Sequence, residues 1–122
     1  MASAVASNLG LTLGEISEGI ARLTPIKHRL QPLALSGGVL AIDDSYNSNP
    51  EGVISALETL ALFEGNKYII TPGIVELGKS ESAINYDFGK RIAKVCKGVI
   101  LVGRARALKI REGLLSEGFN KE

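Results

Sequence analysis

Apolar and polar residues alternate along this chain in segments whose lengths predict strands and helices in turn. Short apolar runs predict strands over residues 33–35, 39–42, 68–70 and 99–102. Apolar residues at helical spacing predict helices over residues 50–63, 80–97 and 104–117. Strands joined by helices of this length favour right-handed crossovers, so we expect the last three strands to be mutually parallel. The predicted class is α/β, with a Rossmann-like, mostly parallel sheet and helices on both of its faces.

The first two strands and the N-terminal segment depart from this rhythm. Ser36-Gly37-Gly38 is too short for a crossover, so it predicts an antiparallel hairpin. Two short helical patterns come earlier, and the second begins with Thr12 and Glu15 at capping-box spacing. The sequence ends at Glu122, where a further strand would be expected after residue 119. Without it, one sheet edge is expected to be uncovered and prone to self-association.

Composition and charge exclude several classes of function. The 122 residues are 45% hydrophobic, which suits one ordinary domain with a core. A net charge of +1 without a basic run argues against nucleic acid as a partner, and no apolar run is long enough to span a membrane. Cys96 is the single cysteine, which excludes an internal disulfide and a cysteine-cluster metal site. We expect a cytoplasmic protein.

Candidate chemistry concentrates in the turn that reads DDSYNSNP, residues 43–50. Asn49 is a good N-cap and Pro50 a good first helical residue, so the turn leads from a strand into a helix. Open α/β sheets bind ligands at such strand ends, where a carboxylate such as Asp44 can accept hydrogen bonds from a ribose diol. The alternative is that Asp43 and Asp44 only bond nearby backbone N–H groups. Asp43 is the better candidate for that structural role, because adjacent strand residues point to opposite sides.

Three motifs together resemble one known family. HRLQ at residues 28–31, DDSYNSNP at 43–50 and TPGIVELG at 71–78 resemble the C-terminal domain of the Mur ligases. The resemblance implies an ATP-dependent carbon–nitrogen ligase of peptidoglycan precursor synthesis. It implies in particular the joining of D-Ala-D-Ala to UDP-N-acetylmuramoyl-tripeptide through an acyl phosphate. ATP and Mg²⁺ are the implied cofactors, and no residue of this chain is expected to be catalytic or to bind metal.

The resemblance also divides the chain and assigns roles to its residues. Residues 1–24 look like a helical remnant of the central ATPase domain, and residues 25–122 like the C-terminal domain, with a truncation at its C-terminal end left open. The N-terminal and central domains of the same ligase are the implied partners. We expect the central domain's phosphate-binding loop, of the G-x-x-x-x-G-K-[ST] kind, to be absent here. The implied contacts are to ATP by Arg29, Asp44 and Asn47, and to substrate by Tyr46, Ser48, Asn49 and Glu76.

Several alternatives stay open at this point. Asn49 is as well suited to capping the helix as to binding a ligand, and Glu76 could equally buttress its loop. His28 is better explained by a structural hydrogen bond than by catalysis, because it has no recognisable nucleophile or metal-ligand arrangement. The chain could also be a stand-alone binding module. A signalling receiver is less favoured, because the required strand-end aspartate and lysine are not in place.

Overall fold

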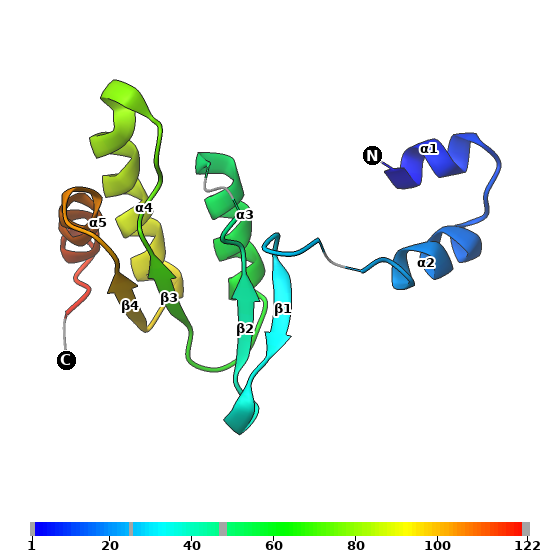
Figure 1. The fold of residues 1–122 in the computed structure, drawn as a ribbon, viewed down its shortest axis with the longest axis horizontal. Coiled ribbons are helices and arrows are strands. Elements are labelled where there is room, and N and C mark those ends of the chain that lie inside the picture. The colour runs from blue at the N-terminus through cyan, green and yellow to red at the C-terminus, as the bar shows by residue number, and fades with distance from the viewer. Residues whose placement is uncertain (1, 25, 47–48, 121–122) are drawn as a thin grey trace.

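The computed structural model describes residues 2–24, 26–46 and 49–120, and these form an α/β fold with two small sheets (Figure 1). In chain order the elements are α1 (Ala2–Asn8), α2 (Leu13–Ala21), β1 (Gln31–Ala34), the 3₁₀ turn η1 (Ser36–Gly38), β2 (Leu40–Asp43), α3 (Pro50–Ala61), β3 (Tyr68–Thr71), the 3₁₀ turn η2 (Gly78–Ser80), α4 (Glu81–Val95), β4 (Gly98–Leu101) and α5 (Ala105–Ser116). The predicted class is confirmed, and each predicted element exists within a few residues of its expected bounds.

Residues 31–61 form a hairpin followed by a capped helix. β1 and β2 pair antiparallel, with Pro32 opposite Ile42, as the short connection predicts. That connection needs glycine, because Gly37 and Gly38 have φ of 73° and 74°. α3 begins where the sequence predicts, at Pro50, behind an Asn49 cap.

The second sheet consists of β3 and β4, which are parallel as predicted, with Ile69 opposite Val99. β2 bonds to neither strand in the described residues, so the expectation of three parallel strands in one sheet is wrong for β2. Strands bond only when they lie about 4.8 Å apart. Figure 1 shows β2 and β3 pointing the same way but not side by side.

The core lies where three helices meet one face of the second sheet. Its buried residues are Leu57, Ile74, Phe88, Ile92, Cys96, Ile110 and Leu114. α4 and α5 pack backbone to backbone, because a Cβ atom on Gly89 would collide with the carbonyl of Ile110, and one on Gly113 with that of Tyr86. These two glycines allow the close helix contact that anchors the C-terminal half.

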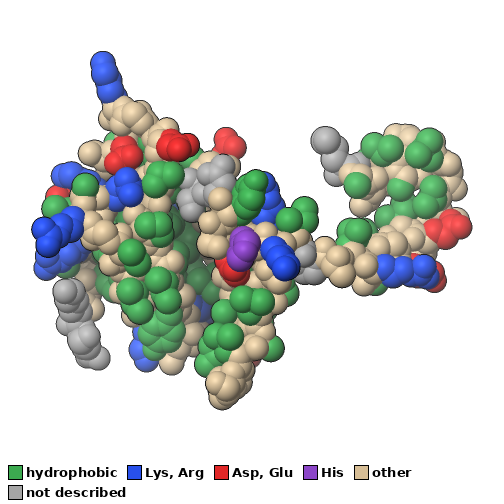
Figure 2. All heavy atoms as spheres, viewed as in Figure 1, with side chains coloured by type: hydrophobic (Ala, Val, Ile, Leu, Met, Phe, Trp, Pro, Cys, Tyr) green, Lys and Arg blue, Asp and Glu red, His purple; other side chains and the backbone are tan. Residues whose placement is uncertain are grey.

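The other face of the second sheet is exposed. Tyr68, Ile70 and Ile100 are 63%, 69% and 60% exposed, so helical cover of this face, which the sequence predicted, is missing in the described residues. Figure 2 shows hydrophobic side chains reaching the surface over the sheets and along α1 and α2. α1 and α2 contain no buried residue, and Figure 1 shows them away from the sheets. In the described part of the chain, no helix has both the length and the apolar character needed to cross a membrane.

Candidate functional site

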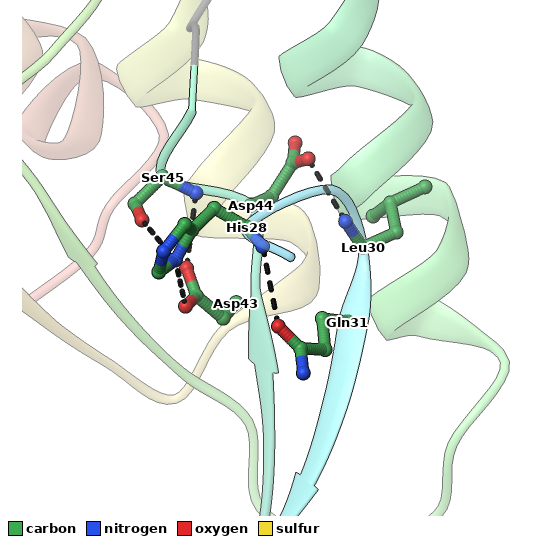
Figure 3. Close-up of polar contacts among 6 residues, drawn as sticks. All are labelled: His28, Leu30, Gln31, Asp43, Asp44 and Ser45. Atoms are coloured by element: carbon green, nitrogen blue, oxygen red, sulfur yellow. Dashed lines mark hydrogen bonds and ion pairs between the residues drawn. The ribbon is translucent and has the colours of Figure 1, made fainter. Parts of the chain in front are cut away.

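The end of β2 and the segment before β1 interlock through backbone and side-chain hydrogen bonds (Figure 3). His28 and Leu30 have φ of 63° and 44°, a left-handed conformation that is unfavourable for these residues. The N–H of Tyr46 donates to the carbonyl of His28 at 3.1 Å, and the N–H of His28 donates to Oε1 of Gln31 at 3.2 Å. The turn that carries Arg29 is therefore held against the DDSYNSNP segment.

Asp43 uses both carboxylate oxygens within the protein. Its Oδ2 lies 2.8 Å from Nδ1 of His28, and its Oδ1 accepts the Ser45 N–H at 3.1 Å. Hydrogen bonding from Ser45, and then from His28, lowers the pKa of the Asp43 carboxyl. These contacts agree with the structural role that strand alternation predicted for Asp43.

His28, Asp43 and Ser45 do not form a hydrolytic triad. The Ser45 hydroxyl lies 3.5 Å from Nδ1 of His28, the same nitrogen that Asp43 contacts. A general base must accept the serine proton on the nitrogen opposite the carboxylate. The cluster therefore orients the turn and does not activate a nucleophile.

Asp44 points away from this cluster (Figure 3). Its Oδ1 accepts the N–H of Leu30 at 3.0 Å, and the residue is half-buried. Part of the structural alternative thus holds for Asp44 as well, because one oxygen fixes the backbone. Among the described residues, no hydrogen bond to its other oxygen, Oδ2, is found, and this oxygen can accept from a ligand.

Arg29 and Tyr46 form an exposed pair at the same turn. The guanidinium carbon of Arg29 lies 4.5 Å from the centre of the Tyr46 ring, and Tyr46 is 65% exposed. Within the described residues no carboxylate forms an ion pair with Arg29. The sequence-predicted residues Arg29, Asp44 and Tyr46 therefore come together, and the cation stays available to an anion.

Asn49 is the one remaining predicted residue of this turn that the structure describes. Asn47 and Ser48 lie outside the described residues. Asn49 caps α3, because its Oδ1 accepts the N–H of Gly52 at 2.7 Å. This amide oxygen is therefore engaged in the fold, and the capping alternative applies to Asn49.

Glu76 belongs to a loop that a buried asparagine holds in place. Asn85 is fully buried, and its side chain bonds both the N–H and the carbonyl of Ile74 and also the carbonyl of Glu81, each at 2.9 Å. Glu76 itself is exposed, with a left-handed φ of 61°. Sequence reasoning missed Asn85; the signal was one polar residue on the inward face of a helix, beside Ile84 and Phe88.

The loop also contains the phosphate-loop sequence pattern, which we expected to be absent. Gly73 to Ser80 reads GIVELGKS and fits G-x-x-x-x-G-K-[ST], so the expected absence of this pattern is wrong. The geometry does not suit a phosphate cradle. The N–H of Gly73 donates to Oγ1 of Thr71 at 3.0 Å, and that of Ile74 donates to Asn85. Both donors are thus engaged, and Glu76 adds a negative charge at the centre of the loop.

Two hollows flank these elements. A cavity of about 130 Å³ between α3 and α4 is lined by both Pro50 and Ile74, which places the DDSYNSNP turn and the Glu76 loop near one another. A larger groove of about 1060 Å³ runs along β4 and α5, and no sequence-predicted site residue lines it. In the described residues no group of three or more potential metal ligands is found.

The structure is thus an α/β domain that brings an arginine and a carboxylate together at the end of β2, the place where open α/β sheets bind ligands. The chain belongs to the Mur ligase family: residues 28–121 match the family model described as Mur ligase, glutamate ligase domain. This match confirms the resemblance read from the three motifs and removes the receiver alternative.

The relatives and solved structures agree with this assignment. The UDP-N-acetylmuramoyl-tripeptide–D-alanyl-D-alanine ligase of Haemophilus influenzae is 30% identical over 75% of this chain and 20% of its own length. The UDP-N-acetylmuramoylalanine–D-glutamate ligase of Pelotomaculum thermopropionicum is 28% identical over 97% of this chain and 24% of its own. A crystal structure of MurF from Acinetobacter baumannii superimposes with a TM-score of 0.77 at 32% identity, over 90% of this chain and 24% of that one. MurF from Thermotoga maritima in complex with ADP gives 0.73 at 29%, over 88% and 24%. The chain thus spans about a fifth to a quarter of the length of these proteins.

Proposed function

We propose that this chain is the C-terminal domain of an ATP-dependent ligase that joins D-Ala-D-Ala to UDP-N-acetylmuramoyl-tripeptide. One observation carries the proposal: an interlocked turn presents the Arg29 cation and an oxygen of Asp44 together at the end of a strand. In the proposed reaction ATP phosphorylates the tripeptide carboxylate, and the amine of the dipeptide then displaces phosphate to form the amide.

The donor and acceptor chemistry of the turn fits ATP. A guanidinium forms paired hydrogen bonds to phosphate oxygens, and Arg29 has no competing ion pair in the described residues. Asp44 would accept from the ribose hydroxyls with Oδ2, and Asn47 would add an amide contact. Mg²⁺ takes oxygen ligands and would be held by ATP phosphates and groups of the central domain.

The same edge would position the incoming amine and exclude water. Tyr46, Ser48 and Glu76 supply hydroxyl and carboxylate groups for the amino substrate, whereas Asn49 is committed to its cap. An acyl phosphate hydrolyses readily, so closure of this domain over the N-terminal and central domains of the same protein protects it. Residues 1–24 would be the end of that central domain, and ATP-driven precursor synthesis would place the protein in the cytoplasm.

The test is substrate choice by the full-length protein that carries this chain. ADP formation is measured with UDP-N-acetylmuramoyl-tripeptide plus D-Ala-D-Ala, and separately with UDP-N-acetylmuramoylalanine plus D-glutamate. The second pair is included because D-glutamate ligases match this chain at similar identity. Turnover with the first pair alone supports the proposal. Turnover with the second pair alone would contradict it and would assign the chain to the D-glutamate ligases.

A further inference from the structure

Arg29 lies in a segment that needs an external restraint. Both of its neighbours, His28 and Leu30, adopt left-handed backbone conformations that cost free energy in a free chain. Such conformations persist only where surrounding contacts impose them. The restraint must therefore come from residues bonded to this segment.

The contacts that impose this conformation come from the end of β2. Asp43 binds the imidazole of His28 at 2.8 Å, and Asp44 binds the N–H of Leu30 at 3.0 Å (Figure 3). The Tyr46 N–H completes the link by donating to the His28 carbonyl. Arg29 is thus held on both sides, and its guanidinium lies over the Tyr46 ring.

We propose that His28 and Asp43 are positioning residues that set the reach of Arg29 toward the nucleotide phosphates. This inference rests on the proposed function and extends it to two residues that do not touch ATP themselves. Asp43 is assigned the positioning role because each of its oxygens already accepts a hydrogen bond within the protein. The His28 side chain is 55% exposed, and its short contact in the described residues is the one from Nδ1 to Asp43.

A double-mutant cycle in the full-length ligase tests whether His28 acts through Arg29. The variants are Arg29→Ala, His28→Ala, the two combined, and His28→Asn, whose amide N–H can replace the Nδ1 donor. The readouts are kcat/KM for ATP and the melting temperature. Lys109→Ala is the matched control, because it removes an exposed ion pair of the same 2.8 Å length on α5.

A residue that acts through Arg29 produces no additional loss once Arg29 is gone. We expect kcat/KM to fall about tenfold in both single variants, the size of one lost charge-assisted bond. The double variant should match Arg29→Ala within about twofold, and His28→Asn should recover most of the loss. Lys109→Ala should leave kcat/KM unchanged.

The failures of the two proposals are distinguishable. An unchanged kcat/KM in Arg29→Ala overturns the Arg29 contact on which the proposed function depends. If Arg29→Ala does lose much of its kcat/KM, the Arg29 contact stands. The positioning role alone is then overturned if His28→Ala retains full kcat/KM, or if the two losses multiply in the double variant. Loss in His28→Ala that follows only from a lower melting temperature also overturns it.

Discussion

At the residue scale, the two adjacent aspartates of the β2 turn have separate tasks. Asp43 accepts hydrogen bonds from His28 and Ser45 with its two oxygens, whereas Asp44 bonds the Leu30 N–H through Oδ1, and among the described residues its Oδ2 has no such bond. Strand alternation predicted the structural role of Asp43, and local spacing predicted the Asn49 cap; the ligand contact of Asp44 stays a prediction. The sequence named no partner for His28, because Asp43 lies fifteen residues away and only the hairpin register brings the two together.

The Asp43 contacts should weaken in acid. Because the pKa of Asp43 is lower in the folded protein, its contribution to stability is complete above the unfolded value of about 3.9 and is lost as the pH falls through the folded value. We expect Asp43→Asn to lower the melting temperature at pH 7 and to have a smaller effect at pH 3. Thermal unfolding of both proteins across this range is the measurement. An equal difference at the two pH values would show that the carboxylate charge contributes nothing.

At the scale of elements, local signals predicted more than non-local ones. The antiparallel hairpin, the start of α3 and the parallel pairing of β3 and β4 follow from turn length, capping and crossover length. In the described residues β2 and β3 are not paired, because their spacing depends on the path of the chain through α3. No short sequence pattern predicts that path. Sequence patterns likewise did not reveal that Asn85 holds the Glu76 loop.

The contact between α4 and α5 should be intolerant of any side chain at its glycines. A methyl group at Gly89 or Gly113 collides with backbone of the facing helix, so Gly89→Ala and Gly113→Ala should each cost about 1–3 kcal/mol of unfolding free energy. Gly19→Ala in α2 is the control, since nothing lies within 4 Å of its Cβ position. It should be neutral or raise stability by up to about 1 kcal/mol. Denaturant unfolding measures all three, and equal effects would refute the close packing.

The phosphate-loop sequence pattern at residues 73–80 should have no role in ATP binding. We expect Lys79→Ala in the full-length protein to leave kcat/KM for ATP within about twofold, because the N–H groups of Gly73 and Ile74 are already bonded. A surface substitution of this kind should also leave stability within about ±0.5 kcal/mol. Steady-state kinetics decide the point. A loss of a hundredfold would show that the loop rearranges to hold phosphate.

At the scale of the whole molecule, this chain carries one side of a proposed active site. It spans about a fifth to a quarter of the length of its relatives, and its exposed Arg29, Tyr46 and apolar residues of α1 and α2 suit the interdomain contacts that the proposed function requires. The sequence alone identified the family through three motifs. It does not separate D-Ala-D-Ala from D-glutamate as substrate, since relatives of both kinds match at similar identity.

The 122-residue chain alone should neither hydrolyse ATP nor form the amide. The reason is the 73–80 loop, in which the N–H groups of Gly73 and Ile74 are bonded within the protein and Glu76 is negative, an arrangement unsuited to the β- and γ-phosphates. Phosphate release is measured with ATP and MgCl₂ against a no-protein blank. Release above the blank that depends on both additions would contradict the assignment.

The most direct test of the central claim is the kcat/KM for ATP of Asp44→Asn in the full-length protein, measured together with its melting temperature. Asparagine keeps an oxygen that can accept the Leu30 N–H but removes the charge offered to the ribose. If Asp44 contacts the ribose, we expect an unchanged melting temperature and a loss of kcat/KM of roughly tenfold or more, equal to about 1.5–3 kcal/mol of transition-state stabilisation. An unchanged kcat/KM would contradict it, because Asp44 would then serve only to hold the turn.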